Sequence, residues 1–143
     1  MIRVEGTIAP AWVAGFFMIA FYVGYGCHKG PANAEITILN SPLRGGGRPV
    51  EMDMITGAVS GVNPNDVKVL IYTHAGDRWW VQPLETYPFT PVGSDRQWRA
   101  KIHLGDEYAA FLVHKDYKSP PTQPLGLPSV GDCIWAVATK EGR

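Results

Sequence analysis

The stretch that decides the fold is Gly105-Asp-Glu-Tyr-Ala-Ala-Phe-Leu-Val113, which places a tyrosine at the start of an apolar, strand-like run. A tight turn at Gly105 and Asp106 precedes the run. In β-sandwiches this is the setting of a tyrosine corner, in which the tyrosine hydroxyl hydrogen-bonds back to the backbone across the sandwich edge. The pattern therefore predicts a structural role for Tyr108 and a sandwich of β-strands around it.

Segments of strand-like composition lie on both sides of this stretch, separated by turn signals at short intervals. Several alternate between apolar and polar residues, so that Trp98, Ala100 and Ile102, for example, share one face. No stretch after residue 30 shows a sustained helical period. Seven short strands joined by loops rich in proline and glycine favour a β-sandwich. The predicted strands are residues 35–39, 50–62, 68–74, 78–82, 97–104, 108–115 and 133–140.

Composition agrees with one turn-rich domain. The chain has 143 residues, with 16 glycines and 12 prolines. Its 13 Lys and Arg balance 13 Asp and Glu, so no charge excess draws it to nucleic acid, and we expect no such partner. Two cysteines are too few for a disulfide scaffold or a multi-cysteine zinc site.

Residues 6–27 contain no Asp, Glu, Lys, Arg or His. As a helix this run would reach roughly 33 Å, enough to cross the hydrocarbon of a bilayer. Trp12 lies near one end of it, and Tyr22 and Tyr25 lie near the other, as expected for aromatic residues at the two membrane interfaces. Residues 1–27 are therefore predicted to hold a single-pass transmembrane helix.

Ala11 and Gly15 are four residues apart and would form a small face on which a partner helix could pack. Two processed forms are alternatives to a spanning helix: a signal peptide cleaved after residues 32–34, and a lipoprotein with a lipidated Cys27. A barely basic N-terminus argues against the first, and the bulky Tyr25 argues against the second. Apolar character on all sides argues against a helix in the core of so small a chain.

Aromatic and turn residues in the second half of the chain resemble a known module. They are the runs 57–72, 79–83, 88–91 and 108–113 together with the lone Trp98. Over about residues 50–139 they resemble a small bacterial immunoglobulin- or fibronectin-like β-sandwich found in secreted and surface proteins, often beside hydrolase domains. The resemblance implies an immunoglobulin-like fold and an extracytoplasmic setting, but no catalytic residues. The chain departs from the pattern in its membrane segment and in Cys133, where a plain apolar residue is expected.

Trp79 and Trp80 are the candidate partner-contact residues. In a strand their side chains point to opposite faces, so one enters the core and the other is at least partly exposed. Packing in the core or at an edge is the first interpretation of the pair. Contact with a partner protein or lipid headgroups, and stacking on a sugar ring, are the alternatives.

Other chemistry-bearing residues point to no site. Cys27 and Cys133 would pair if the domain were exported, but the default interpretation is two unrelated thiols. The acidic residues fall mostly at turns, and no nucleophile or phosphate-loop motif occurs. We therefore expect no catalytic residue, no cofactor and no metal site. Four histidines lie on different segments without metal-binding spacing: His28, His74, His103 and His114.

These observations divide the chain into an N-terminal segment (1–27), a linker with the first strand (28–49) and a β-sandwich domain (50–143). The leading hypothesis is a non-enzymatic accessory subunit that stabilises or bridges neighbouring integral subunits of a larger membrane complex. A photosynthetic or respiratory assembly is one candidate host. The alternative is a membrane-anchored envelope module that recognises a glycan or a surface partner. The first predicts a Trp79–Trp80 region covered by protein, and the second predicts an exposed tryptophan beside polar groups.

Overall fold

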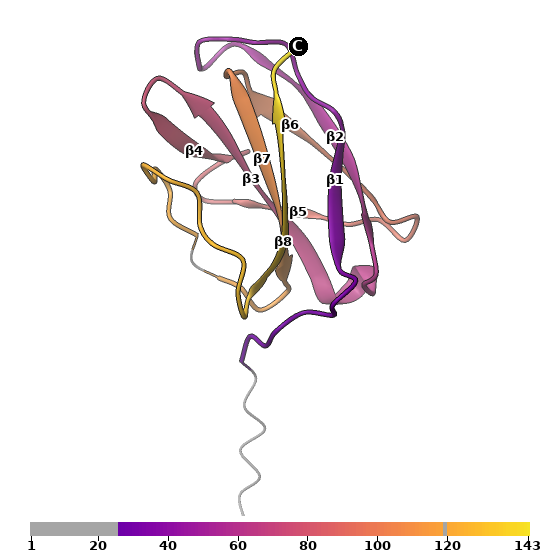
Figure 1. Ribbon diagram of the computed structural model, residues 1–143. Coiled ribbons are helices and arrows are strands. Elements are labelled where there is room, and N and C mark those ends of the chain that lie inside the picture. Colours follow the sequence, from indigo (N-terminus) through magenta and orange to yellow (C-terminus); the bar gives the residue numbers. More distant parts are fainter. Residues whose placement is uncertain (1–25, 119) are drawn as a thin grey trace, which may run out of the picture.

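Figure 1 shows a computed structural model of the chain, which describes residues 26–118 and 120–143. Within these ranges the chain forms β-strands and one short 3-10 helix, η1 (Pro64–Asp66), and it contains no α-helix. The strands are β1 (Glu35–Asn40), β2 (Met52–Ser60), β3 (Val67–Ala75), β4 (Arg78–Gln82), β5 (Phe89–Pro91), β6 (Gln97–His103), β7 (Glu107–His114) and β8 (Ile134–Glu141).

The eight strands form two antiparallel sheets. One has the order β1-β2-β6, and the other has the order β4-β3-β7-β8. The short β5 pairs with residues 68–70 of β3, and β4 pairs with residues 71–75, so that both cover the same edge of β3. On one side of the molecule β1 lies beside β8 (Figure 1). On the other side, β4 and β5 form the edge of the larger sheet, and β6 forms the edge of the smaller one.

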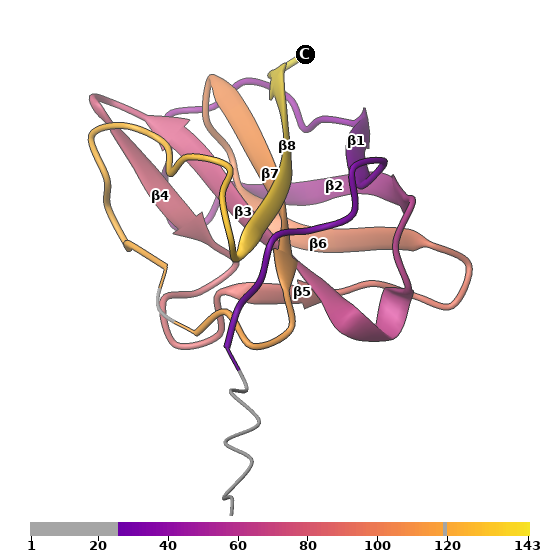
Figure 2. The same ribbon diagram turned by 60° about the horizontal axis from the view of Figure 1, so that its bottom comes forward.

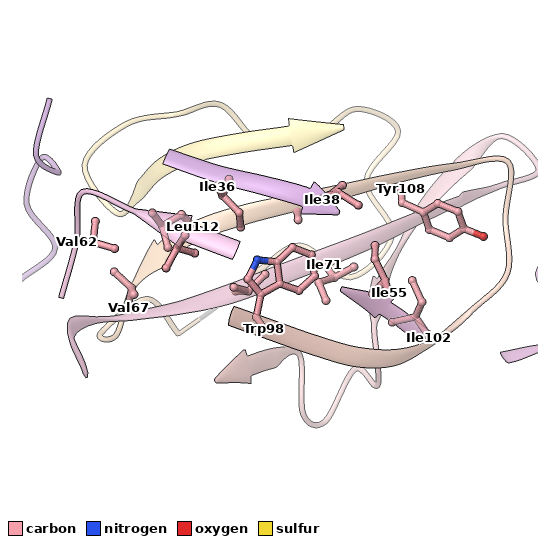
Figure 3. Close-up of a cluster of buried hydrophobic side chains, with 13 residues drawn as sticks. Ile36, Ile38, Ile55, Val62, Val67, Ile71, Trp98, Ile102, Tyr108 and Leu112 are labelled. Atoms are coloured by element: carbon pink, nitrogen blue, oxygen red, sulfur yellow. The ribbon is translucent and has the colours of Figure 1, made fainter. Parts of the chain in front are cut away.

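The main core lies between the two sheets, where alternate residues of each strand point inward (Figure 3). Ile55, Ile71 and Ile102 are fully buried there. Trp98 on β6 is paired with Gly57 on β2, and a Cβ at position 57 would collide with the indole ring. A glycine at position 57 therefore makes room for the largest side chain of this core.

The outer face of the larger sheet carries a second apolar cluster, covered by the connection between β7 and β8 at residues 115–133. The Tyr72 hydroxyl donates a hydrogen bond of 2.6 Å to the Pro121 carbonyl. The backbone of β4 donates two bonds of 3.1 Å to the Thr122 and Pro124 carbonyls of the same connection. This connection therefore shields both the apolar face and the outer edge of β4 from solvent.

The predicted mainly-β, two-sheet architecture is confirmed, and each of the seven predicted strands overlaps an observed one. The sequence predicts no strand between residues 82 and 97, and this prediction is wrong, because β5 lies there. Three residues ending in a proline show no alternation from which a strand could be read. They pair with β3 because β4 leaves the first part of that edge uncovered.

The predicted membrane segment lies outside the described residues, except for its last two positions. Ala11, Trp12, Gly15, Tyr22 and Tyr25 all belong to the part that is not described. In residues 26–118 and 120–143, no helix is long and apolar enough to cross a membrane. The spanning helix therefore stays a prediction.

Candidate functional site

The hairpin of β3 and β4 separates the two neighbouring tryptophans. Trp79 is 8% exposed and belongs to the outer cluster beneath the 115–133 connection. Trp80 points to the other face of the strand and is 40% exposed. Its indole Nε1 donates a hydrogen bond of 3.2 Å to the Ala75 carbonyl, which ties the ring to the hairpin. The structure therefore presents Trp80 to solvent at the side of the sandwich opposite β1 and β8.

Trp80 lines a pocket of about 460 Å³ between β4, the end of β6 and the loop after β1. We name this hollow the edge pocket. Its volume lies in the range of small-ligand sites. The lining residues are Gly46, Gly47, Pro49, Thr73, Ala75, Gly76, Trp80, Gln82 and His103.

Hydrogen bonds link three polar residues at the edge pocket, Thr73, Gln82 and His103. The Gln82 carboxamide oxygen accepts bonds of 3.0 Å from both the backbone N–H and the Nδ1 of His103. The Thr73 hydroxyl donates to the His103 carbonyl at 3.1 Å. Gln82 is only 3% exposed and Thr73 is fully buried, so this network holds its geometry before any ligand arrives.

The network also sets the tautomer of His103. An amide oxygen only accepts hydrogen bonds, so the contact with Gln82 places the proton on Nδ1. In the neutral ring Nε2 is then left with a lone pair that can accept a hydrogen bond from a hydroxyl. The site offers an aromatic ring, neutral hydrogen-bonding groups and exposed glycine backbone. Among the described residues that line it, none is Asp, Glu, Lys or Arg.

Gln82, His103 and Thr73 were not singled out by sequence reasoning as members of a site with Trp80. The sequence could have indicated Gln82, because Trp80 and Gln82 are two residues apart in a strand and must share a face. It could not have indicated His103, which reaches Gln82 from the other sheet. Only the packing of the two sheets brings them together.

Tyr108 lies at the end of the main core, fully buried. Its hydroxyl accepts a hydrogen bond of 3.0 Å from the Gly105 N–H and donates one of 2.9 Å to the Leu43 carbonyl. Burial raises the pKa of this hydroxyl above its ordinary value. The residue therefore connects the turn before β7 to the loop after β1 and lies outside the edge pocket.

The start of the described chain is fastened to the beginning of β8 and to the residue before it. Cys27 and Cys133 form a disulfide with their Cα atoms 4.8 Å apart, so the default interpretation of two unrelated thiols is wrong. The Trp135 indole donates a hydrogen bond of 2.8 Å to the His28 carbonyl, and the His28 ring lies 4.8 Å from the His114 ring. The sequence indicated the Cys27–Cys133 pair only as the alternative for an exported domain. It did not indicate the His28 contacts, because they join segments more than 80 residues apart.

Metal-binding and titration features do not add a second site. Among the described residues, no group of three or more His, Cys, Asp or Glu is placed to hold a metal ion. Burial raises the pKa of the Tyr72 and Tyr117 hydroxyls, which lie under or within the 115–133 connection. Desolvation lowers the pKa of the Lys68 ammonium, which lies 3.6 Å from the centre of the Phe89 ring. None of these groups lines the edge pocket.

Comparisons with known proteins found no matching family model, no matching curated protein and no matching solved structure.

Proposed function

We propose that the protein is a non-enzymatic, membrane-anchored binding module that takes a neutral saccharide in the edge pocket. The observation that carries the proposal is the exposed Trp80 on the wall of a 460 Å³ hollow, beside the buried Gln82–His103 network. Sugar rings have an apolar C–H face and a rim of hydroxyls. An aromatic ring beside neutral donors and acceptors matches both features.

The setting we propose is extracytoplasmic, with an immunoglobulin-like sandwich held at the membrane by residues 1–27. The Cys27–Cys133 disulfide supports this placement, because disulfides persist in oxidising compartments and are rare in the cytosol. The two-sheet architecture supports the fold assignment at the level of a β-sandwich. The anchor rests on the uncharged run at residues 6–27.

The accessory-subunit hypothesis makes a different prediction for the same residues. It needs neighbouring subunits to cover the Trp80 surface, whereas the saccharide proposal needs that surface open to solvent. Extraction of native membranes with mild detergent, followed by native separation, distinguishes the two. Stoichiometric migration in one large complex, with Trp80 shielded from oxidative labelling, would favour the subunit.

The direct test uses the full chain in detergent micelles against a panel of immobilised neutral glycans. Binding to at least one neutral glycan is expected, and Trp80→Ala should weaken it about tenfold or more, while Trp80→Phe keeps a flat face and most of the affinity. Tyr87→Ala is the matched control, because Tyr87 is an aromatic residue that is 64% exposed and does not line the pocket. Absence of binding to every glycan, or equal loss in the Trp80 and Tyr87 variants, would refute the proposal.

A further inference from the structure

A second hollow of about 210 Å³ lies beside the edge pocket, further along β4. The two share three lining residues, Trp80, Gln82 and His103, so Trp80 forms part of the wall of both. The second hollow also contains Leu84 and Glu85 from the loop after β4, and Thr122 and Gln123 from the connection that covers β4.

The two hollows lie one after the other along the strand β4, on the side of Trp80 and Gln82. The edge pocket reaches the turn before β4 at Gly76, and the second hollow reaches the loop after it at Glu85. The five residues of β4 alone extend roughly 14 Å. That length exceeds a single pyranose ring, so a ligand confined to one ring would leave part of this surface empty.

The charges of the lining residues limit the ligand. Among the described residues, Glu85 is the one lining residue of the two hollows that carries a carboxylate, and none is a lysine or an arginine. An anionic sugar would therefore meet a like charge and no compensating cation. Hydroxyl groups, in contrast, can donate hydrogen bonds to this carboxylate.

Resting on the proposed function, we infer that the two hollows form one groove for a neutral oligosaccharide of two or more rings whose chain passes over Trp80. Chains with β-1,4 linkages are the best-matched class, because they are extended and straight, like the line of the two hollows along β4. The edge pocket holds one ring and the second hollow holds the next. Gln123 and Glu85 then contact only the second ring.

The test measures binding of the full chain in micelles to cello- and chito-oligosaccharides, from monomer to tetramer, by calorimetry. We expect the tetramer to bind at least tenfold more tightly than the monomer. Gln123→Ala should weaken tetramer binding about fivefold and leave monomer binding unchanged. Gln97→Ala is the matched control, an exposed glutamine on the other sheet that lines neither hollow.

A second arm examines charge. The unmodified protein should not bind tetragalacturonate, and Glu85→Gln should raise affinity for this anionic chain without weakening that for the neutral tetramer by more than about fivefold. Equal affinities for monomer and tetramer, or an unchanged tetramer affinity in Gln123→Ala, would overturn the groove while leaving a single-ring site intact. Binding of the anionic tetramer as tightly as the neutral one would overturn it as well. Absence of binding to all these sugars together with the broader panel would instead refute the proposed function, and the groove with it.

Discussion

Replacing Tyr108 with phenylalanine tests how the turn before β7 is held. The substitution keeps the ring in the core and removes only the hydroxyl, so it leaves no cavity. It breaks two hydrogen bonds, one from the Gly105 N–H and one to the Leu43 carbonyl. The expected effect depends on how much free energy of unfolding is lost when each backbone group is left without its partner.

The two groups differ in their access to water. Gly105 is buried, and the Tyr108 hydroxyl is the only partner of its N–H among the described residues, so this donor becomes unsatisfied at about 1–3 kcal/mol. Leu43 is exposed, and water can replace the lost bond to its carbonyl at little cost. The expected loss in the free energy of unfolding is therefore about 2 kcal/mol.

Urea unfolding followed by tryptophan fluorescence measures this loss. With the slopes typical of small proteins, about 2 kcal/mol lowers the midpoint by roughly 1 M at an unchanged slope. Tyr87→Phe is the control, because this exposed residue should change stability by less than about 0.5 kcal/mol. A Tyr108→Phe midpoint equal to that of the control would show that the hydroxyl does not hold the turn.

Three further predictions follow from other contacts. The double variant C27S/C133S should lose about 2–4 kcal/mol in urea unfolding, because the disulfide closes a loop with a sequence separation of 106. Burial raises the pKa of Tyr72, so its contribution to stability is complete below the unfolded-state value of about 10 and declines as pH rises above that value. Tyr72→Phe should make the fall in stability above about pH 10 shallower, whatever its effect at neutral pH. Gly57→Ala should cost about 1–3 kcal/mol and alter the near-ultraviolet dichroism of Trp98, because the added Cβ meets both the Thr37 carbonyl and the indole ring.

Strands were predictable where alternation was long enough to be read. The inward positions of β6, Trp98 and Ile102, follow directly from the period of two along Gln97–His103. The same reasoning has nothing to use in β5, whose three residues gain their strand conformation from an unfilled edge of β3. Local sequence reveals the alternation of a strand such as β6, whereas only the assembled sheet shows that β5 is a strand.

The second apolar cluster shows a related limit. Strand β7 (Glu107–His114) is buried on both faces, so its sequence reads as a continuous apolar run. Such a run indicates a covered strand, but it does not say what covers it. The cover proves to be the proline-rich connection before β8, whose hydrogen bonds to β4 come from backbone carbonyls and leave no trace in side-chain type.

Only part of the candidate site could be predicted from the sequence. Alternation in β4 requires one tryptophan of the pair to face each way, and the structure buries Trp79 and exposes Trp80. Which of the two is exposed depends on the face that the 115–133 connection covers. The polar partner His103 arrives from the opposite sheet, so no spacing within the sequence points to it.

The fastened start of the described chain and the edge pocket lie at opposite ends of the sandwich, and this arrangement bears on the proposed function. The described chain begins at one end of the sandwich, where the disulfide and the Trp135–His28 bond fasten it to the beginning of β8 and to the residue before it. The turn between β3 and β4, which forms part of the edge pocket, lies at the opposite end in both Figure 1 and Figure 2. A domain held by a flexible linker would sample many orientations, whereas two contacts close to residue 27 restrict that freedom. With the apolar run in a membrane, as proposed, this arrangement turns the pocket away from the bilayer, toward ligands in the space beyond it.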